Sequence, residues 1–222
     1  MKKTEKNLYL LCMFASMLLI TANCIAAKVW DLGFTMFGYG VTLTTGALCY
    51  PFLSMVTDTI NELWGDKTAK RVVWGGFAVQ AVSTLFIVIA RYMPAADPIM
   101  QESYVNLLGQ NWVFVVASLS AYLVSSFSDI YFFGKIRNAQ EGSGKLNGKG
   151  RSVRAAVSTI IGQGIDSLVY VLIAFGLGFG WLFNGNAGMM FNMILAQWLI
   201  KVVLSFVGLP LFHIFTRRAK NV

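Results

Sequence analysis

Charged side chains are scarce in this sequence. Only 13% of its 222 residues are charged, whereas 56% are hydrophobic and the mean hydropathy is +0.62. A soluble domain of this size needs more charge on its surface, so the composition excludes a soluble protein and indicates a polytopic, all-α membrane protein. The apolar stretches fill nearly the whole chain, which predicts one transmembrane domain over residues 1–222 and no separate soluble domain.

Residues that commonly carry catalysis or bind metals are also few. The chain has one histidine and three cysteines. An odd number of cysteines without metal-ligand spacing argues against a disulfide framework or a metal site, so we expect small packing residues. The sequence shows no nucleophile elbow, no His-x-x-x-His pair and no nucleotide-binding motif. It therefore predicts a protein that is not an enzyme and uses no cofactor.

Six apolar stretches are long enough to cross a bilayer, which takes about 20 helical residues. The first follows a basic N-terminus, as a signal peptide would, but it is long and lacks a clear cleavage site, so we expect a membrane helix. The predicted spans are Asn7–Ala27, Tyr39–Asn61, Val72–Tyr92, Trp112–Phe133, Ala155–Trp181 and Ala187–Phe215.

Two local features refine these spans. Pro51 falls inside the second span, where a proline removes a backbone hydrogen bond and permits a kink. The segment Pro94–Asn111 between the third and fourth spans is long enough for a short surface helix or a lid over an outward opening.

Basic residues are distributed very unequally between the two sides of these spans. Fifteen of the 18 lysines and arginines fall at the N-terminus, after even-numbered spans and at the C-terminus, and only Lys28 and Arg91 lie on the other side. By the positive-inside rule, both termini face the cytoplasm of a bacterial inner membrane. The net charge of +8 is therefore a signal of topology and of attraction to anionic lipid, and we expect no nucleic-acid partner.

Polar side chains form stripes at helical spacing on the last three predicted spans. A charge at bilayer depth costs about 2.5–3.5 kcal/mol on insertion scales, so it is rarely without a function. The alternative is a purely structural role, in which hydroxyls and an Asp166–Lys201 ion pair hold helices together. The stripes consist of Ser118, Tyr122, Ser125 and Asp129; Thr159, Gln163, Asp166 and Tyr170; and Gln197, Lys201 and Ser205.

Further carboxylates lie near the cytoplasmic ends of predicted spans. Asp58 and Glu62 are one helical turn apart, and Asp129 lies at similar depth. They either line a binding site or snorkel to water and pair with basic residues of the interface. The predicted partners for the second interpretation are Lys70, Arg71 and Arg137.

Several blocks of this sequence, in order along nearly the whole chain, resemble the bacterial queuosine precursor transporter family, also called the vitamin uptake transporter family. The order and spacing of the blocks carry the resemblance more than any one of them. The blocks are Tyr50-Pro51-Phe52, Thr57-Asp58, Asn61-Glu62-Leu63-Trp64-Gly65 and Lys70-Arg71; Ser128-Asp129, Phe133 and Arg137; Ser158-Thr159, Gln163, Asp166 and Ser167; and Lys201 with Pro210.

The resemblance implies uptake of 7-deazaguanine precursors of queuosine: 7-cyano-7-deazaguanine, 7-aminomethyl-7-deazaguanine or queuine. It also implies a six-transmembrane-helix bundle resembling the substrate-binding subunits of ECF-type transporters. The alternative is a subunit that binds another vitamin-like molecule and needs an energising partner. Ala22 and Ala26 form a small-residue pattern typical of helix packing, compatible with such docking or with a homodimer.

The chemistry of a guanine-like base suits the polar residues. Its N1 and exocyclic amine are donors that one carboxylate accepts in bidentate fashion, and aromatic side chains can stack on its flat ring. We expect Asp166 or Glu62 to bind this edge. The predicted substrate-binding residues are Asn23, Asp58, Glu62, Asp129, Gln163, Asp166 and Lys201. A structural or assembly protein and an intramembrane enzyme remain the alternatives from other classes.

Overall fold

The computed structural model covers all 222 residues and describes most of them. The described residues are 2–26, 28–36, 38–108, 112–142, 148–178, 180–185, 187–206 and 208–217.

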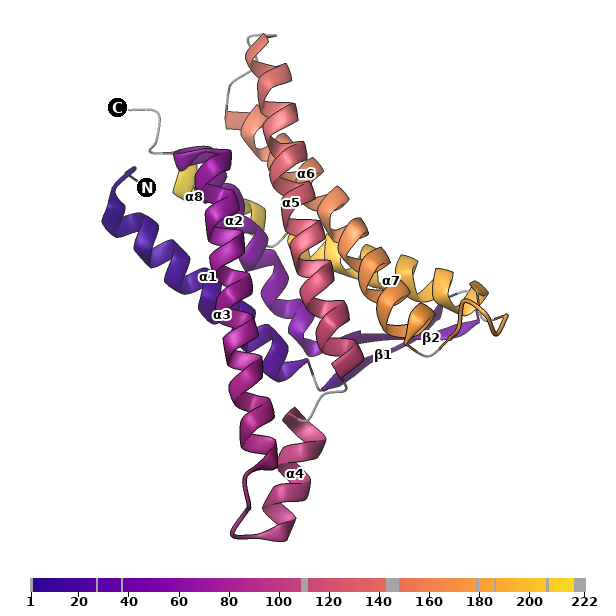
Figure 1. Ribbon diagram of the computed structural model, residues 1–222. Helices are drawn as coiled ribbons and strands as arrows, with labels where there is room; N and C mark the ends of the chain where they lie inside the picture. The colour runs from indigo at the N-terminus through magenta and orange to yellow at the C-terminus, as the bar shows by residue number, and fades with distance from the viewer. Residues whose placement is uncertain are drawn as a thin grey trace.

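The chain is built mainly of helices, with one antiparallel β-hairpin near its N-terminus (Figure 1). A 3₁₀ segment, η1, precedes α2, and a π-helical segment, η2, continues α6. In order, the elements are α1 (Glu5–Ile25), β1 (Val29–Met36), β2 (Tyr39–Thr44), η1 (Thr45–Cys49), α2 (Tyr50–Trp64), α3 (Asp66–Tyr92), α4 (Pro98–Leu108), α5 (Trp112–Gly142), α6 (Gly148–Val171), η2 (Leu172–Leu177), α7 (Ala187–Ser205) and α8 (Gly208–Arg217).

Five helical stretches are long and apolar enough to cross a membrane, which confirms the class predicted from composition. They contain α1, α3, α5, α6 and α7. Helix α3 shows why the surface is so apolar: Val73, Gly76 and Gln80 are buried on one face, whereas Trp74 and Phe86 on other faces are more than half exposed. A helix that exposes aromatic side chains in this way is suited to lipid.

The expected span Tyr39–Asn61 is not one helix, and this part of the prediction is corrected. Its first half forms strand β2 and segment η1, and only α2 is α-helical. Alternating β-branched residues between Gly40 and Gly46 favour a strand over a helix. Pro51 lies in the first turn of α2, where its missing N–H costs nothing, so it starts the helix instead of kinking it.

The last two expected spans also have different limits. Helix α6 begins at Gly148, earlier than the expected Ala155, and continues into η2. Helix α7 ends at Ser205, and α8 begins at Gly208 with Pro210 in its first turn. Proline cannot continue a helix without losing a hydrogen bond and clashing with the preceding turn, so a new helix begins there.

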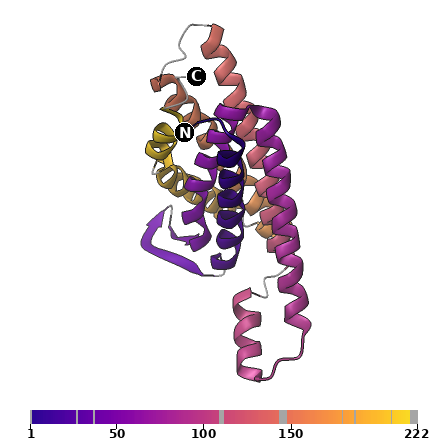
Figure 2. The same ribbon diagram turned by 90° about the vertical axis from the view of Figure 1, so that its left-hand side faces the viewer.

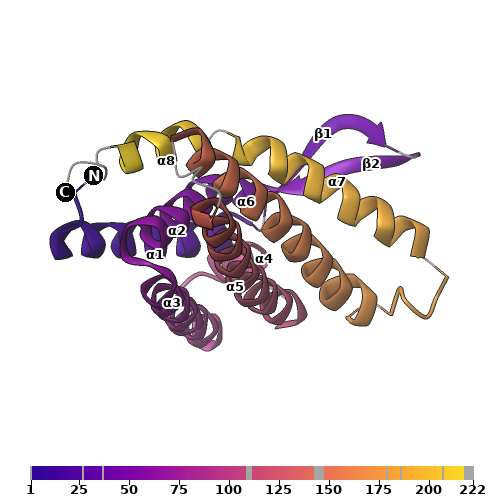
Figure 3. The same cartoon turned by 90° about the horizontal axis from the view of Figure 1, so that it is seen from above.

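Helix α6 lies between α5 and α7 and packs along both, while the hairpin lies beside α7 (Figure 3). Helix α1 begins, α2 meets α3, and α8 lies at one end of the molecule (Figure 1). The sharp α2–α3 turn depends on Gly65, whose φ of +85° is in a region that other residues avoid.

The segment after α3 forms a short helix, as predicted. Helix α4 extends from the rest of the bundle beside the end of α3 (Figures 1 and 2). Two contacts hold it there: Gln101 donates to the carbonyl of Arg91 at 2.8 Å, and the Tyr104 hydroxyl donates to the carbonyl of Ile87 at 3.0 Å. Residues 109–111 of the expected segment lie outside the described residues.

Candidate functional site

The largest cavity lies among α1, α2, α5, α6 and α7, and it has a volume of about 390 Å³. That volume is within the range of small-molecule sites. Its wall mixes amides, aromatic rings and one pair of opposite charges. The lining residues are Ala22, Asn23, Ala26, Thr44, Gly46, Tyr50, Asn106, Leu107, Phe114, Ser118, Ala121, Asp166, Tyr170, Phe175, Gln197 and Lys201.

A buried ion pair forms the charged part of this cavity. The Lys201 ammonium lies 2.6 Å from Oδ2 of Asp166, and the two residues are only 5% and 4% exposed. Ser125 donates to the other carboxylate oxygen at 3.4 Å. The Lys201 ammonium also lies 5.1 Å from the centre of the Tyr50 ring, a cation–π distance. The two charges that were predicted on consecutive spans are therefore in contact.

Aromatic side chains form a second part of the wall. The Phe175 ring lies 5.8 Å from Phe114 and 6.5 Å from Tyr170, measured between ring centres, and both pairs meet edge to face. Phe175 belongs to the π-helical segment η2, and Tyr170 follows Asp166 by one turn on α6. Flat, apolar surfaces therefore stand next to a carboxylate, an arrangement that suits a planar polar ligand.

Asn23 contributes a fixed amide to the cavity. Its Nδ2 donates to the carbonyl of Leu19 at 3.0 Å, and its Oδ1 accepts from the Ser118 hydroxyl at 3.1 Å. These contacts join α1 to α5 and set the orientation of the amide.

Two more of the predicted site residues line a separate, smaller cavity. Asp129 and Gln163 border a space of about 30 Å³ between α2, α5 and α6. Gln163 donates to the Ser54 hydroxyl at 3.4 Å. Gly162 permits the close approach of α6 to this carboxylate, because a Cβ there would lie 3.2 Å from the Asp129 Cβ.

The remaining two predicted residues, Asp58 and Glu62, line neither cavity. Asp58 is buried and accepts from the Thr159 hydroxyl at 3.3 Å. Glu62 binds the guanidinium groups of Arg151, at 3.4 Å, and Arg154. The expected interfacial partners of these carboxylates are corrected: among the described contacts, Arg137 pairs with Glu141 of its own helix.

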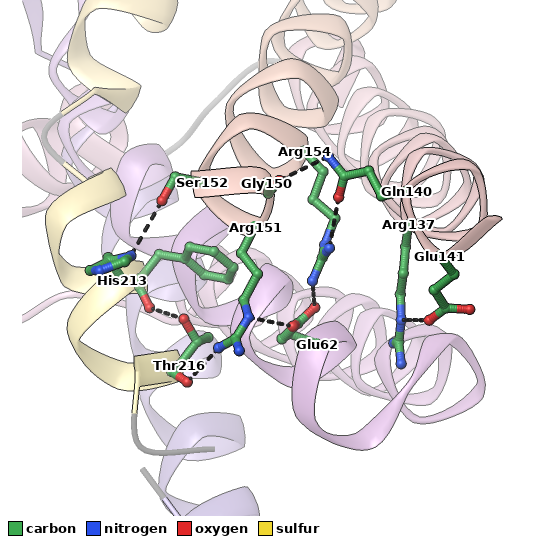
Figure 4. Close-up of polar contacts among 11 residues, drawn as sticks. Glu62, Arg137, Gln140, Glu141, Gly150, Arg151, Ser152, Arg154, His213 and Thr216 are labelled. Atoms are coloured by element: carbon green, nitrogen blue, oxygen red, sulfur yellow. Dashed lines mark hydrogen bonds and ion pairs between the residues drawn. The ribbon is translucent and has the colours of Figure 1, made fainter. Parts of the chain in front are cut away.

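Figure 4 shows how this arginine cluster joins the start of α6 to three other helices. Arg154 is fully buried, donates to Gln140 of α5 at 2.9 Å, and lies 5.2 Å from the Phe133 ring centre. Arg151 donates to the carbonyl of Thr216 in α8 at 2.8 Å. The cluster closes one end of the bundle with charge-assisted contacts.

The structure thus distributes the seven predicted residues over three levels along α6. The arginine cluster with Glu62 comes first, the small cavity with Asp129 and Gln163 second, and the large cavity with Asp166 third. Sequence reasoning missed Tyr50 and Phe175 as cavity residues and assigned Arg151 and Arg154 to topology alone. The i, i+4 spacing of Asp166 and Tyr170 already indicated one wall, but no sequence signal indicates which helix faces it.

Together, the apolar helices and the enclosed polar cavity define a multi-pass membrane protein with an internal site for a small molecule. The comparisons with known proteins agree with this class. Residues 44–215 match the family described as "Putative vitamin uptake transporter", and the chain belongs to that family. It is accordingly a transport protein and not an enzyme.

Two curated relatives extend this result. The chain is 27% identical over 192 residues to the "Probable queuosine precursor transporter" of Bacillus subtilis (strain 168), covering 86% of this chain and 76% of the relative. It is 22% identical over 170 residues to the "Queuosine precursor transporter" of Escherichia coli (strain K12), covering 77% and 69%. No solved structure matches the chain.

Proposed function

We propose that this protein takes up queuosine precursors of the 7-deazaguanine type through the bacterial inner membrane. The names of both curated relatives support this substrate class. The observation that carries the proposal is the Asp166–Lys201 pair inside an aromatic-walled cavity of about 390 Å³. Few small molecules offer the donors, acceptors and flat surface that this combination requires.

Asp166 is the residue that binds the donor edge of the base. Its carboxylate can accept the N1 and exocyclic-amine protons in bidentate fashion, while Lys201 moves to the ring carbonyl oxygen. Removing the lysine from a buried carboxylate is costly unless other donors replace it. A guanine-like edge supplies those donors, so the pair is closed without substrate and opens for the correct one. Glu62 is no longer a candidate for this role, because two arginines already bind it.

The aromatic residues then hold the ring. Tyr50 lies against the Lys201 ammonium, and Phe175 and Tyr170 stand beside the carboxylate. Stacking on these rings supplies affinity that does not depend on the 7-substituent. Asn23 and Gln197 supply amides at the remaining edge of the base.

The membrane topology has six segments with both termini cytoplasmic, as in ECF-type substrate-binding subunits. Helix α2 has 15 residues, about 22 Å at the α-helical rise, so η1 and β2 complete the second segment. The beginning of α1 and helix α8 lie at the same end of the molecule, which supports this topology (Figure 1).

A subunit that docks on an energising partner is less well supported. The small residues expected to form such a docking stripe pack inside the chain: a Cβ at Gly46 would lie 2.4 Å from the Ala22 carbonyl oxygen and 3.3 Å from the Ala26 Cβ. The Ala22–Ala26 face is therefore occupied by η1. We propose that the chain transports without a partner, and a homodimer would have to use another face.

Ligand-induced thermal stabilisation of the detergent-purified protein tests the substrate class. A ligand that binds only the folded state raises the melting temperature by mass action. We expect 7-cyano-7-deazaguanine and 7-aminomethyl-7-deazaguanine to stabilise the protein more than guanine does. No shift with any deazaguanine would refute the proposed substrate class.

Asp166→Asn tests the assigned role of Asp166. An amide in that position presents donors where the base also presents donors, so stabilisation by the deazaguanines should be lost. Asp31→Asn is the matched control, because Asp31 is exposed on the hairpin and bonds only locally to Gly33. Uptake into liposomes that contain this chain alone then separates a transporter from a binding subunit.

A further inference from the structure

The smaller cavity has a composition that the binding of a purine base does not explain. Its polar lining carries oxygen-bearing groups from three helices: Ser54 and Thr57 of α2, Ser125 and Asp129 of α5, and Gln163 of α6. Its volume of about 30 Å³ is far too small for a bicyclic base but holds one water-sized species.

Two acceptors at this cavity lack a hydrogen-bond partner among the described residues. They are Oδ1 of Asp129 and Oε1 of Gln163, on side chains that are only 6% exposed. Thr57 donates its proton to the Leu53 carbonyl at 3.1 Å, so its oxygen offers only lone pairs. A buried acceptor without a donor is destabilising, and a bound cation would remove that cost at both groups.

The buried charges around this cavity point to the same conclusion. Within the described residues, the ion pairs join Glu62 to Arg151 and Arg154, and Asp166 to Lys201. No printed ion pair reaches Asp129 or the neighbouring Asp58, and these two buried carboxylates repel each other. A buried carboxylate requires a positive charge or a proton nearby.

We propose that the small cavity is a binding site for one sodium ion, with Asp129 as its carboxylate ligand and Gln163 and Thr57 as neutral oxygen ligands. Hard cations take oxygen ligands, and transporters place such sites at the depth of the substrate. One carboxylate in the lining matches a single positive charge. A proton alone would need no cavity and would leave the Gln163 oxygen without a partner.

The position of this site relative to the large cavity indicates its role. Tyr50 lines both cavities, and Ser125 lines the small cavity while donating to Asp166 in the large one. An ion that orders Ser125 would therefore orient the carboxylate that binds the base. The sodium ion is then a coupling ion for uptake, and this role rests on the proposed function, whereas the ion site itself does not.

Sodium-dependent stability of the purified protein tests the site without any precursor. Melting temperatures are measured in NaCl, KCl and choline chloride at equal ionic strength and at two pH values. We expect 100 mM NaCl to raise the melting temperature by about 3–6 °C over choline, by mass action with a millimolar Kd. KCl should do much less. Stabilisation that follows pH but not sodium would overturn the proposal in favour of a protonation site.

Variants locate the effect. Asp129→Asn and Gly162→Ala should both abolish the sodium shift, since the new Cβ at residue 162 would displace the Asp129 side chain. If Asp129→Asn does not fold, Gly162→Ala still decides the matter. Asp31→Asn should keep the wild-type shift. A sodium shift that survives in both site variants would overturn the assignment.

The substrate arm separates the two proposals. Sodium should increase the affinity for the deazaguanines, and the deazaguanines should increase the affinity for sodium by the same factor. Precursor binding that is the same with and without sodium would refute coupling and leave the proposed function intact. A sodium shift without any precursor binding would refute the substrate class and leave the ion site intact.

Discussion

The Asp166–Lys201 pair allows the strongest test of whether the polar stripes serve binding or only hold helices together. Lys201→Met leaves the Asp166 carboxylate buried with only the Ser125 hydroxyl as a donor. Removing one partner of a buried ion pair costs about 3–5 kcal/mol. For a chain of this size we expect a fall in melting temperature of about 10 °C. Asp166→Asn should destabilise similarly, because it leaves the ammonium unpaired.

The double variant Asp166→Asn/Lys201→Met separates the two roles. With both charges removed, no buried charge lacks a partner, so stability should return to near the wild-type value. Binding of 7-deazaguanines should nevertheless stay absent, because no carboxylate remains in the large cavity to accept the donor edge.

The assay is thermal unfolding of the detergent-purified protein, with and without 7-aminomethyl-7-deazaguanine. A double variant that is as unstable as the single variants would show that the pair does not act as a unit. A double variant that still binds the precursor would refute the role of Asp166 and favour a structural pair.

Three further substitutions test other parts of the structure. Arg154→Met should lower the melting temperature by about 10 °C, because Glu62 loses its fully buried partner. Phe175→Leu should weaken precursor binding about 2–10-fold in thermal titration, the value of one aromatic contact, with little change in stability. Gly46→Ala should lower the melting temperature by about 2–10 °C, because the new Cβ would overlap the Ala22 carbonyl oxygen and force the backbone apart.

Each substitution has a matched control on the same molecule. Arg137→Met removes an exposed arginine whose pair with Glu141 is worth about 1 kcal/mol or less. Phe183 is 80% exposed, so Phe183→Leu should not change binding. Gly75 has open space where a Cβ would stand, so Gly75→Ala should be neutral. A control that behaves like its partner would contradict the corresponding explanation.

The membrane class and the polar faces of single helices were predictable because both depend on local sequence. Apolar runs of about 20 residues identify a span regardless of its neighbours. The i, i+4 spacing of Gln197 and Lys201 places them on one helix face, and both line the large cavity.

The hairpin was not predictable in the same way. Between Tyr39 and Cys49, an apolar run with several threonines fits a strand or a buried helix equally well by periodicity. Contacts far away in sequence decide between them: the Thr45 N–H donates to the Lys28 carbonyl at 2.9 Å, and β2 pairs with β1. A helix there would leave those partners unsatisfied.

The sequence by itself therefore determined a basic, lipid-embedded helical protein whose spans carry specific polar stripes and whose blocks resemble one transporter family. Only the tertiary structure decided how the charges pair: Lys201 with Asp166, the two arginines with Glu62, and neither with Asp129. The physical reason is that helix periodicity sets the face of each side chain, whereas the partner across the bundle depends on how helices pack and how deep each residue lies.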